Sequence, residues 1–246
     1  SAKARDVMAQ ISDLNQEELT AEQAYMAANL YLREGEMAQA EQAVLNLEQD
    51  SEWLPYYHFN RGVRLSDSGS WQDAVVSFQQ LSGLKTRSSE LKHLRDRAHT
   101  AAGFALMAAG EYELAQQEFR QVRLESLLVG QALLGYGWAA AQQENYEQAL
   151  SPWQSLRDHS LMEASAQESL LAVPYAYEKL EAPGNALFEY ERSVDLLQQE
   201  LEGVDRAIEK FTQAPVAELF DFDILVNATP LPILGSGRAA DQRKIL

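Results

Sequence analysis

The stretch Gly103–Phe119, with the sequence GFALMAAGEYELAQQEF, reads as two short helices joined by a turn. Gly103 and Leu106 share one face of the first helix, and Gly110 is the type of residue that commonly ends a helix. The second helix is predicted by apolar residues three and four apart, at Tyr112, Ala115, Phe119 and Val122. One such hairpin cannot bury its own apolar faces, so further copies are expected to stack against it.

Copies of this hairpin recur along the chain. The small residue of the second helix repeats with steps of 34, 41, 34 and 37 residues, at Ala40, Ala74, Ala115, Ala149 and Ala186. Four positions later each copy has a larger residue, at Val44, Phe78, Phe119, Trp153 and Tyr190. The turn glycine, or the residue that replaces it, stands at Gly35, Gly69, Gly110, Glu144 and Glu181. The first helices carry a small residue in the same register, at Ala28, Gly62, Gly103 and Gly137, with Pro174 in the last copy. Columns that recur together over five copies indicate a repeat protein.

Two of these steps equal the 34-residue period of helix-turn-helix repeats, and on these columns the chain resembles tetratricopeptide repeat proteins. The resemblance covers Ala21–Leu197. It implies an all-α fold, a right-handed superhelical solenoid whose first helices line a concave inner face. The chain departs from the pattern at Pro174 and Pro183, so we expect the fifth copy to be a degenerate capping unit. Inserted residues in Lys85–Asp96 are expected to lengthen a helix or a connection.

The predicted solenoid spans residues 1–211, and an irregular apolar segment with a polar tail follows at 212–246. The solenoid divides into a half repeat at 1–14, five units at about 21–53, 54–87, 95–127, 129–160 and 162–197, and a capping helix that continues to 211. Because the chain begins in mid-repeat, we expect either a piece of a longer protein or an N-terminal cap. The long last helix would be able to lead into a coiled coil in a longer protein.

Residues 216–234 are rich in apolar side chains but keep no helical period, and Pro230 and Pro232 interrupt them. An apolar stretch of this kind is not expected to stay free in water. We predict that it occupies the groove of its own chain or of a neighbouring copy, which would produce a homo-oligomer. The candidate self-inserting residues are Leu219, Phe220, Phe222, Ile224 and Leu225.

Acidic residues outnumber basic ones by 37 to 20, which gives a net charge of −17. This charge argues against nucleic acid and anionic membrane surfaces as partners, because both require clustered Lys and Arg. The chain has no cysteine, which excludes disulfides and thiolate metal sites. No apolar run approaches the ~18 residues of a membrane span, so no direct membrane insertion is predicted.

The sequence offers little for catalysis or metal binding. His93 and His99 are the histidines closest in sequence, but six residues apart on one helix they do not share a face, which argues against a metal site. Motifs for a nucleophilic serine, a phosphate loop or a zinc protease do not occur. Acidic pairs such as Glu17 and Glu18 have no neighbours that would shift their pKa. We therefore predict no catalytic residue, no metal and no cofactor.

The candidate binding residues lie on the first helices. The resemblance implies that side chains of these helices that are not used in packing project into the concave groove. They are Tyr25, Asn29, Tyr56, Phe59, Val63, Arg97, Thr100, Phe104, Met107, Leu134, Trp138, Leu171 and Tyr175. Aromatic side chains at such positions favour an apolar occupant. A second interpretation follows the chaperone-binding members of the family, which hold the terminal carboxylate of a peptide. Three of their positions are matched in this chain, by Asn29, Asn60 and Arg97. At the other two positions, where basic residues are expected, the chain has Tyr25 and Ala101.

The leading hypothesis is a non-catalytic scaffold that binds a peptide or a segment of a partner protein in its concave aromatic groove. The alternative is a structural spacer or assembly module within a longer envelope protein. An enzyme is the third class, and it is disfavoured because packing residues occupy the places where a reaction needs converging polar groups. The Ala-, Gln- and Leu-rich units are similar to bacterial repeat proteins of the cell envelope, so we expect a periplasmic location, with the cytoplasm as the alternative.

Overall fold

The computed structural model describes residues 19–48, 50–157, 161 and 163–213. Within these ranges the regular secondary structure is entirely α-helical, which confirms the predicted all-α class. The helices are α2 (Ala21–Glu34), α3 (Met37–Val44), α4 (Leu54–Asp67), α5 (Trp71–Gln79), α6 (Ser89–Ala108), α7 (Tyr112–Arg120), α8 (Val129–Gln142), α9 (Tyr146–Leu156), α10 (Ala164–Lys179) and α11 (Pro183–Gln213).

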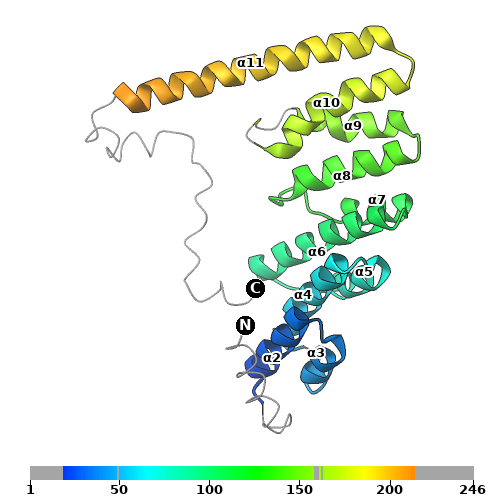
Figure 1. The fold of residues 1–246 in the computed structure, drawn as a ribbon, viewed down its shortest axis with the longest axis vertical. Coiled ribbons are helices and arrows are strands. Elements are labelled where there is room, and N and C mark those ends of the chain that lie inside the picture. Colours follow the sequence, from blue (N-terminus) through cyan, green and yellow to red (C-terminus); the bar gives the residue numbers. More distant parts are fainter. Residues whose placement is uncertain (1–18, 49, 158–160, 162, 214–246) are drawn as a thin grey trace.

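The helices pack as consecutive pairs, and each pair lies against the next one (Figure 1). The first helices of the pairs, α2, α4, α6, α8 and α10, contact one another in that order and form one layer. The second helices α5, α7 and α9 lie along the opposite side of the array (Figure 1). This one-dimensional stacking is the predicted solenoid, in which every unit buries its apolar faces on its neighbours.

The turns within the pairs confirm the predicted turn column. Gly35, Gly69 and Gly110 have φ angles of 83°, 79° and 80°, in the left-handed region that ends a helix. Glu144 and Glu181 adopt φ angles of 60° and 55° at the equivalent positions. The chain therefore keeps the same turn geometry even where it has no glycine.

The two helices of a unit are held together by a small residue opposite a large one 16 positions later. A Cβ atom on Gly62 would lie 2.5 Å from a ring carbon of Phe78, and one on Gly103 would lie 2.6 Å from a ring carbon of Phe119. At Gly137 it would lie 2.2 Å from Nε1 of Trp153. These contacts are too short for any side chain, which explains the glycines as packing residues. The recurring alanines of the second helices are also buried.

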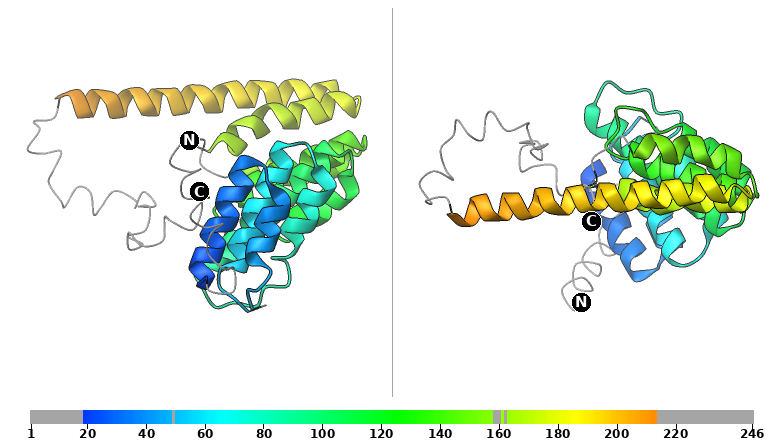
Figure 2. Two further views of the ribbon diagram at one scale, coloured as in Figure 1. Left: turned by 60° about the horizontal axis from the view of Figure 1, so that its bottom comes forward. Right: turned by 90° about the horizontal axis from the view of Figure 1, so that it is seen from above.

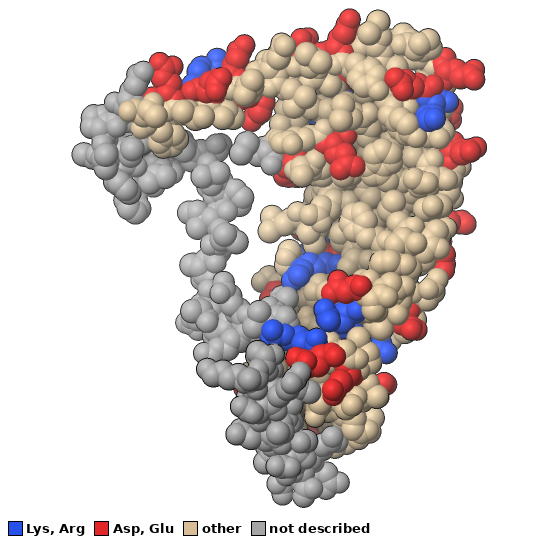
Figure 3. Space-filling model, viewed as in Figure 1, with Lys and Arg blue, Asp and Glu red and all other residues tan. Residues whose placement is uncertain are grey.

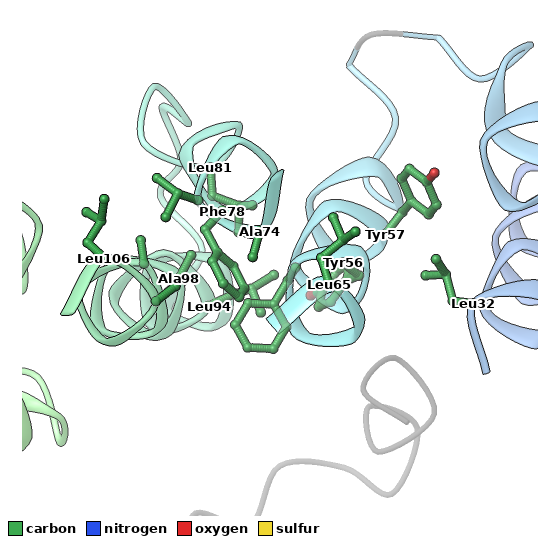
Figure 4. Packing of buried hydrophobic residues seen from close by; sticks show 14 of the residues in the cluster. Leu32, Tyr56, Tyr57, Leu65, Ala74, Phe78, Leu81, Leu94, Ala98 and Leu106 are labelled. Atoms are coloured by element: carbon green, nitrogen blue, oxygen red, sulfur yellow. The ribbon is translucent and has the colours of Figure 1, made fainter. Parts of the chain in front are cut away.

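A hydrophobic core runs between the layers. Around α4, α5 and α6 it includes Leu32, Tyr56, Tyr57, Leu65, Ala74, Phe78, Leu81, Leu94, Ala98 and Leu106 (Figure 4). Toward the C-terminal units a second cluster forms around Trp153, Leu156 and Val173. Each cluster joins residues of several helices, so no unit has a core of its own.

The insertion predicted in residues 85–96 lengthens a first helix. α6 contains 20 residues, whereas α4 and α8 contain 14 each. The helix begins at Ser89, earlier than the expected unit boundary at 95, because the hydroxyl of Ser88 accepts a hydrogen bond from the amide of Leu91 at 3.3 Å. Asp96, which follows the added residues, is buried in the core, where Arg123 donates a hydrogen bond to its carboxylate.

The last helix, α11, has 31 residues and extends well beyond the helix it packs against, α10 (Figure 2). The described part of α11 reaches Gln213, two residues past the predicted bound at 211. The expected half repeat at 1–14 and the candidate self-inserting residues Leu219, Phe220, Phe222, Ile224 and Leu225 lie outside the described residues.

Candidate functional site

The inner face of the solenoid is formed by the first helices and is hollowed between α11 and the N-terminal units (Figure 3). Two columns of side chains lie along this face. The members of a column stand at the same sequence distance from the small residue of each first helix. The column directly after the small residue contains Asn29, Val63, Phe104, Trp138 and Tyr175. The column three residues before it contains Tyr25, Phe59, Thr100, Leu134 and Leu171.

In the N-terminal units the large residues of this face are buried. Tyr25, Tyr56 and Phe59 expose only 1%, 2% and 4% of their surface. The rings of Tyr25 and Trp53 lie 5.0 Å apart, and the Arg97 guanidinium covers the Phe59 ring at 4.6 Å. The expectation that these three side chains project freely into the groove is therefore wrong, because residues of neighbouring segments cover them.

The polar residues of the same region satisfy one another. The Asn60 amide donates to the Tyr25 hydroxyl at 3.2 Å and to the side-chain oxygen of Asn29 at 3.0 Å. Burial raises the pKa of Tyr25 and lowers that of Arg97. Two of the three residues that matched a carboxylate-holding site are thus engaged within the array, and the third covers an aromatic ring.

The C-terminal units present an apolar surface instead. Phe104 is 44% exposed and Leu171 is 62% exposed, and the remaining members are partly exposed. We call this surface the apolar strip; it consists of Phe104 and Met107 on α6, Leu134 and Trp138 on α8, and Leu171 and Tyr175 on α10. The two members on each helix are one turn apart, so the strip crosses three successive first helices.

Aromatic contacts orient the rings of the strip. The Phe104 ring stands edge-on to the buried Phe119 ring, with centroids 5.1 Å apart. The Trp138 ring packs in the same way on Trp153 at 4.8 Å, and its other neighbour is Tyr175 at 6.0 Å. Such edge-to-face contacts restrict ring rotation. The strip therefore offers partly exposed rings whose positions are already set.

Few charged groups interrupt the strip. The indole nitrogen of Trp138 donates to the Glu168 carboxylate at 2.7 Å, and the Lys179 ammonium lies 5.5 Å from the centre of the Tyr175 ring. Lys and Arg gather instead over the region of α4 and α6 in the lower part of the visible face (Figure 3). The surface thus changes from basic and polar in the N-terminal units to apolar in the C-terminal ones.

A second hollow, which the repeat pattern did not predict, lies between α3, α4 and α5. It has a volume of about 410 Å³ and is bordered by Val44, Leu45, Leu54, Tyr57 and Val76, among others. Tyr57 is buried, and its hydroxyl has no hydrogen-bond partner among the described residues. Burial raises the pKa of this hydroxyl. No column of the repeat pattern contains Tyr57, so no sequence signal marked this hollow.

Within the described residues, no three His, Cys, Asp or Glu side chains are grouped so that they could hold a metal ion. The same part of the chain contains no helix that is both long enough and apolar enough to cross a membrane.

Comparison with known proteins supports the fold and no more than the fold. No family model and no curated protein matches this chain. A crystal structure of MamA is similar, with a TM-score of 0.53, 14% sequence identity and coverage of 71% of this chain and 96% of MamA. A MamA RS-1 double mutant gives a TM-score of 0.52 at 17% identity, covering 73% of this chain and 96% of that one. A putative kinesin light chain from Podosopora anserina, with nearly identical TPR-like repeats, gives 0.51 at 16% identity over 78% of this chain and 96% of its own. By its fold, the chain is therefore a tetratricopeptide-like α-solenoid.

Proposed function

We propose that the protein is a non-catalytic scaffold that binds a segment of a partner protein on the apolar strip. The observation that carries this proposal is the exposure of Phe104 and Leu171 beside the partly exposed Trp138 and Tyr175 on three successive inner helices. Aromatic side chains that are partly exposed and already oriented are typical anchors of protein interfaces. Because their positions are fixed in the free protein, little side-chain entropy is lost on binding.

The dimensions of the strip suit a short segment. Neighbouring helices pack about 8–10 Å apart, so three of them span roughly 20 Å between the outer axes. An extended chain rises about 3.3 Å per residue, so about six or seven residues would cross the strip. We infer that the occupant supplies two or three apolar side chains, since the strip itself offers few charges with which to pair.

The segment around Leu219–Leu225 of the same chain is one candidate for this occupant. It has the required apolar side chains, namely Leu219, Phe220, Phe222, Ile224 and Leu225. Occupation by this segment would regulate access of another partner, or would join two copies if the segment came from a neighbour.

A peptide-display selection on the full chain tests the proposal. Peptides recovered on the wild-type protein should lose at least roughly tenfold in affinity for the double variant Phe104→Ala and Leu171→Ala, as expected for the loss of two interface anchors. A matched control is Leu114→Ala, because Leu114 is 45% exposed but lies on α7 in the other layer. Equal affinity for the double variant and the wild type would refute the apolar strip as the binding surface.

A synthetic peptide of residues 216–234 provides the second arm of this experiment. If the self-inserting segment is an occupant, this peptide should compete with the selected peptides on a chain that ends at Gln213. Absence of competition would exclude the chain's own segment and leave the strip to another protein.

A second candidate function is that of a spacer or assembly module. It is favoured by α11, whose 31 residues carry the chain well beyond the stacked units (Figure 2).

A further inference from the structure

Eight apolar residues of α11 follow a heptad repeat. They alternate at intervals of three and four residues over four heptads: Leu187, Tyr190, Val194, Leu197, Leu201, Val204, Ile208 and Phe211. A strict seven-residue repeat corresponds to 3.5 residues per turn, whereas a straight α-helix has 3.6. A sequence that keeps the shorter period is typical of a helix that winds around another helix. We call these eight residues the α11 seam.

Apart from Tyr190, which is half-buried and hydrogen-bonded to Glu178 of α10, the α11 seam is separate from the face that joins α11 to the array. Ala186, Glu189 and Ser193 are buried, and the Ser193 hydroxyl donates to the carbonyl oxygen of Leu170 in α10 at 2.8 Å. Glu189 accepts a hydrogen bond from Arg157. By contrast, every member of the seam except Tyr190 is between 40% and 65% exposed. The contacts of α11 with the solenoid therefore leave the seam open to a further helix.

The residues beside the seam are acidic or neutral. In heptad terms, the flanking e positions hold Glu191, Gln198, Asp205 and Thr212, and the g positions hold Ser193, Glu200 and Ala207. The basic residues of α11 are Arg192, Arg206 and Lys210, and they fall at f and c positions, away from the seam. Since e and g side chains select the partner of a coiled coil, these flanks favour a helix that carries positive charge there.

Pairing of two identical copies would bring like charges together. In a parallel pair, Glu200 of one chain would face Asp205 of the other. In an antiparallel pair that keeps all four heptads in contact, Glu200 would face Glu200, and Glu191 would face Asp205. Like charges at such positions are unfavourable, so the charge pattern disfavours a second copy as the occupant in both orientations.

We propose that the α11 seam binds an amphipathic helix of another protein, with apolar residues at its a and d positions and Lys or Arg at its e and g positions. This interaction is independent of the apolar strip. Gly203 lies at a c position of α11 and weakens the helix where it extends from the array. Burial of the seam against a partner helix would stabilise this part of α11, because packing supplies most of the stability of helices in proteins.

Two synthetic four-heptad peptides test the proposal on the full chain. Both have Leu at the a and d positions; one has Lys at e and g, and the other has Glu. The fluorescently labelled peptides are titrated at concentrations at which each alone is monomeric. We expect the Lys peptide to bind at least about tenfold more tightly than the Glu peptide, since several e–g pairs change from repulsive to attractive.

The triple variant Glu191→Lys, Glu200→Lys and Asp205→Lys provides the decisive control, because it leaves the seam intact. This variant should reverse the order of the two affinities. The variant Phe104→Ala and Leu171→Ala should bind the Lys peptide as the wild type does, which separates this site from the apolar strip. Far-ultraviolet circular dichroism checks that each variant keeps its helix content.

Three results would overturn the proposal. Equal affinity for the two peptides would show that the seam binds apolar helices without selecting their charge. Binding of neither peptide would show that the seam does not pair with helices. The third result is a wild-type chain that sediments as a dimer while the Leu201→Asp variant sediments as a monomer. This result would assign the seam to a second copy of the chain.

Discussion

The exposed ring of Phe104 stands edge-on against the buried ring of Phe119, with centroids 5.1 Å apart at an interplanar angle of 74°. The same Phe119 ring fills the space beside Gly103, the residue that precedes Phe104. Phe119 of the second helix therefore packs the two helices of the unit together. It also orients Phe104, the side chain that we assign to the binding surface.

This arrangement predicts that Phe104 and Phe119 differ in their contributions to stability. Phe119→Ala removes a buried ring and should lower the free energy of unfolding by about 3–5 kcal/mol. Phe104→Ala removes a half-exposed ring and one edge-to-face contact, so it should cost only about 0.5–1.5 kcal/mol. Urea unfolding monitored by circular dichroism measures both values. A loss at Phe104 as large as that at Phe119 would show that Phe104 is a core residue and not a binding residue.

Two glycines of the chain should respond to the same substitution in opposite directions. Gly103→Ala places a methyl group 2.6 Å from Phe119, and overpacking of this kind costs about 1–3 kcal/mol. Gly203→Ala meets no atom within 4 Å and should stabilise α11 by up to about 1 kcal/mol. Amide hydrogen exchange of the full chain should accelerate in α6 and α7 for the first variant and slow in α11 for the second. Slower exchange in α6 on Gly103→Ala would contradict the packing role.

The repeat pattern predicted the packing residues well, because the partners of these contacts are a fixed distance apart in the sequence. The 16-residue separation of Gly103 and Phe119 recurs in every unit, so a comparison of the copies is sufficient to find it. The turn residues Glu144 and Glu181 were found in the same way, even though neither is a glycine.

Exposure on the inner face could not be predicted from the same columns. Phe59 and Phe104 lie on this face in successive units, yet one is 4% exposed and the other 44%. The two residues belong to different columns, and Phe59 is buried in part because the Arg97 guanidinium of α6 covers its ring, 4.6 Å from the ring centre. The residues at the position of Arg97 in the other units are Glu22, Tyr56, Gln131 and Glu168, so this contact leaves no repeating signal in the sequence.

The hydrogen-bonded contact between Glu118 and His99 predicts a loss of stability in acid. Burial raises the pKa of the Glu118 carboxyl, but hydrogen bonds from His99 and Gln79 outweigh it, so the net pKa lies below its usual value. A depressed pKa in the folded state stabilises the protein above the unfolded value of about 4.3, and this contribution disappears as the pH falls through the lower, folded value. The urea concentration at the unfolding midpoint of the wild type should therefore decrease when the pH is lowered below about 4.5.

The variant Glu118→Gln should be less stable than the wild type at pH 6, and the difference should shrink toward pH 3. Glu113→Gln is the matched control, since Glu113 lies exposed on the same helix. A difference between Glu118→Gln and the wild type that stays constant across this range would mean that the carboxylate charge does not contribute.

The buried pair of Asp96 and Arg123 should show an asymmetry between its two partners. The Asp96 carboxylate is fully buried and accepts hydrogen bonds from Arg123 at 2.7 Å and 3.0 Å, whereas the Arg123 side chain is 27% exposed. Arg123→Ala leaves a buried carboxylate without its cation and should cost about 3–5 kcal/mol. Asp96→Ala should cost less, because the guanidinium can turn toward water. The double variant should be more stable than Arg123→Ala alone, since it no longer buries an unpaired charge. Urea unfolding of the three variants measures these differences, and equal losses for both single variants would show that Arg123 is as confined as Asp96.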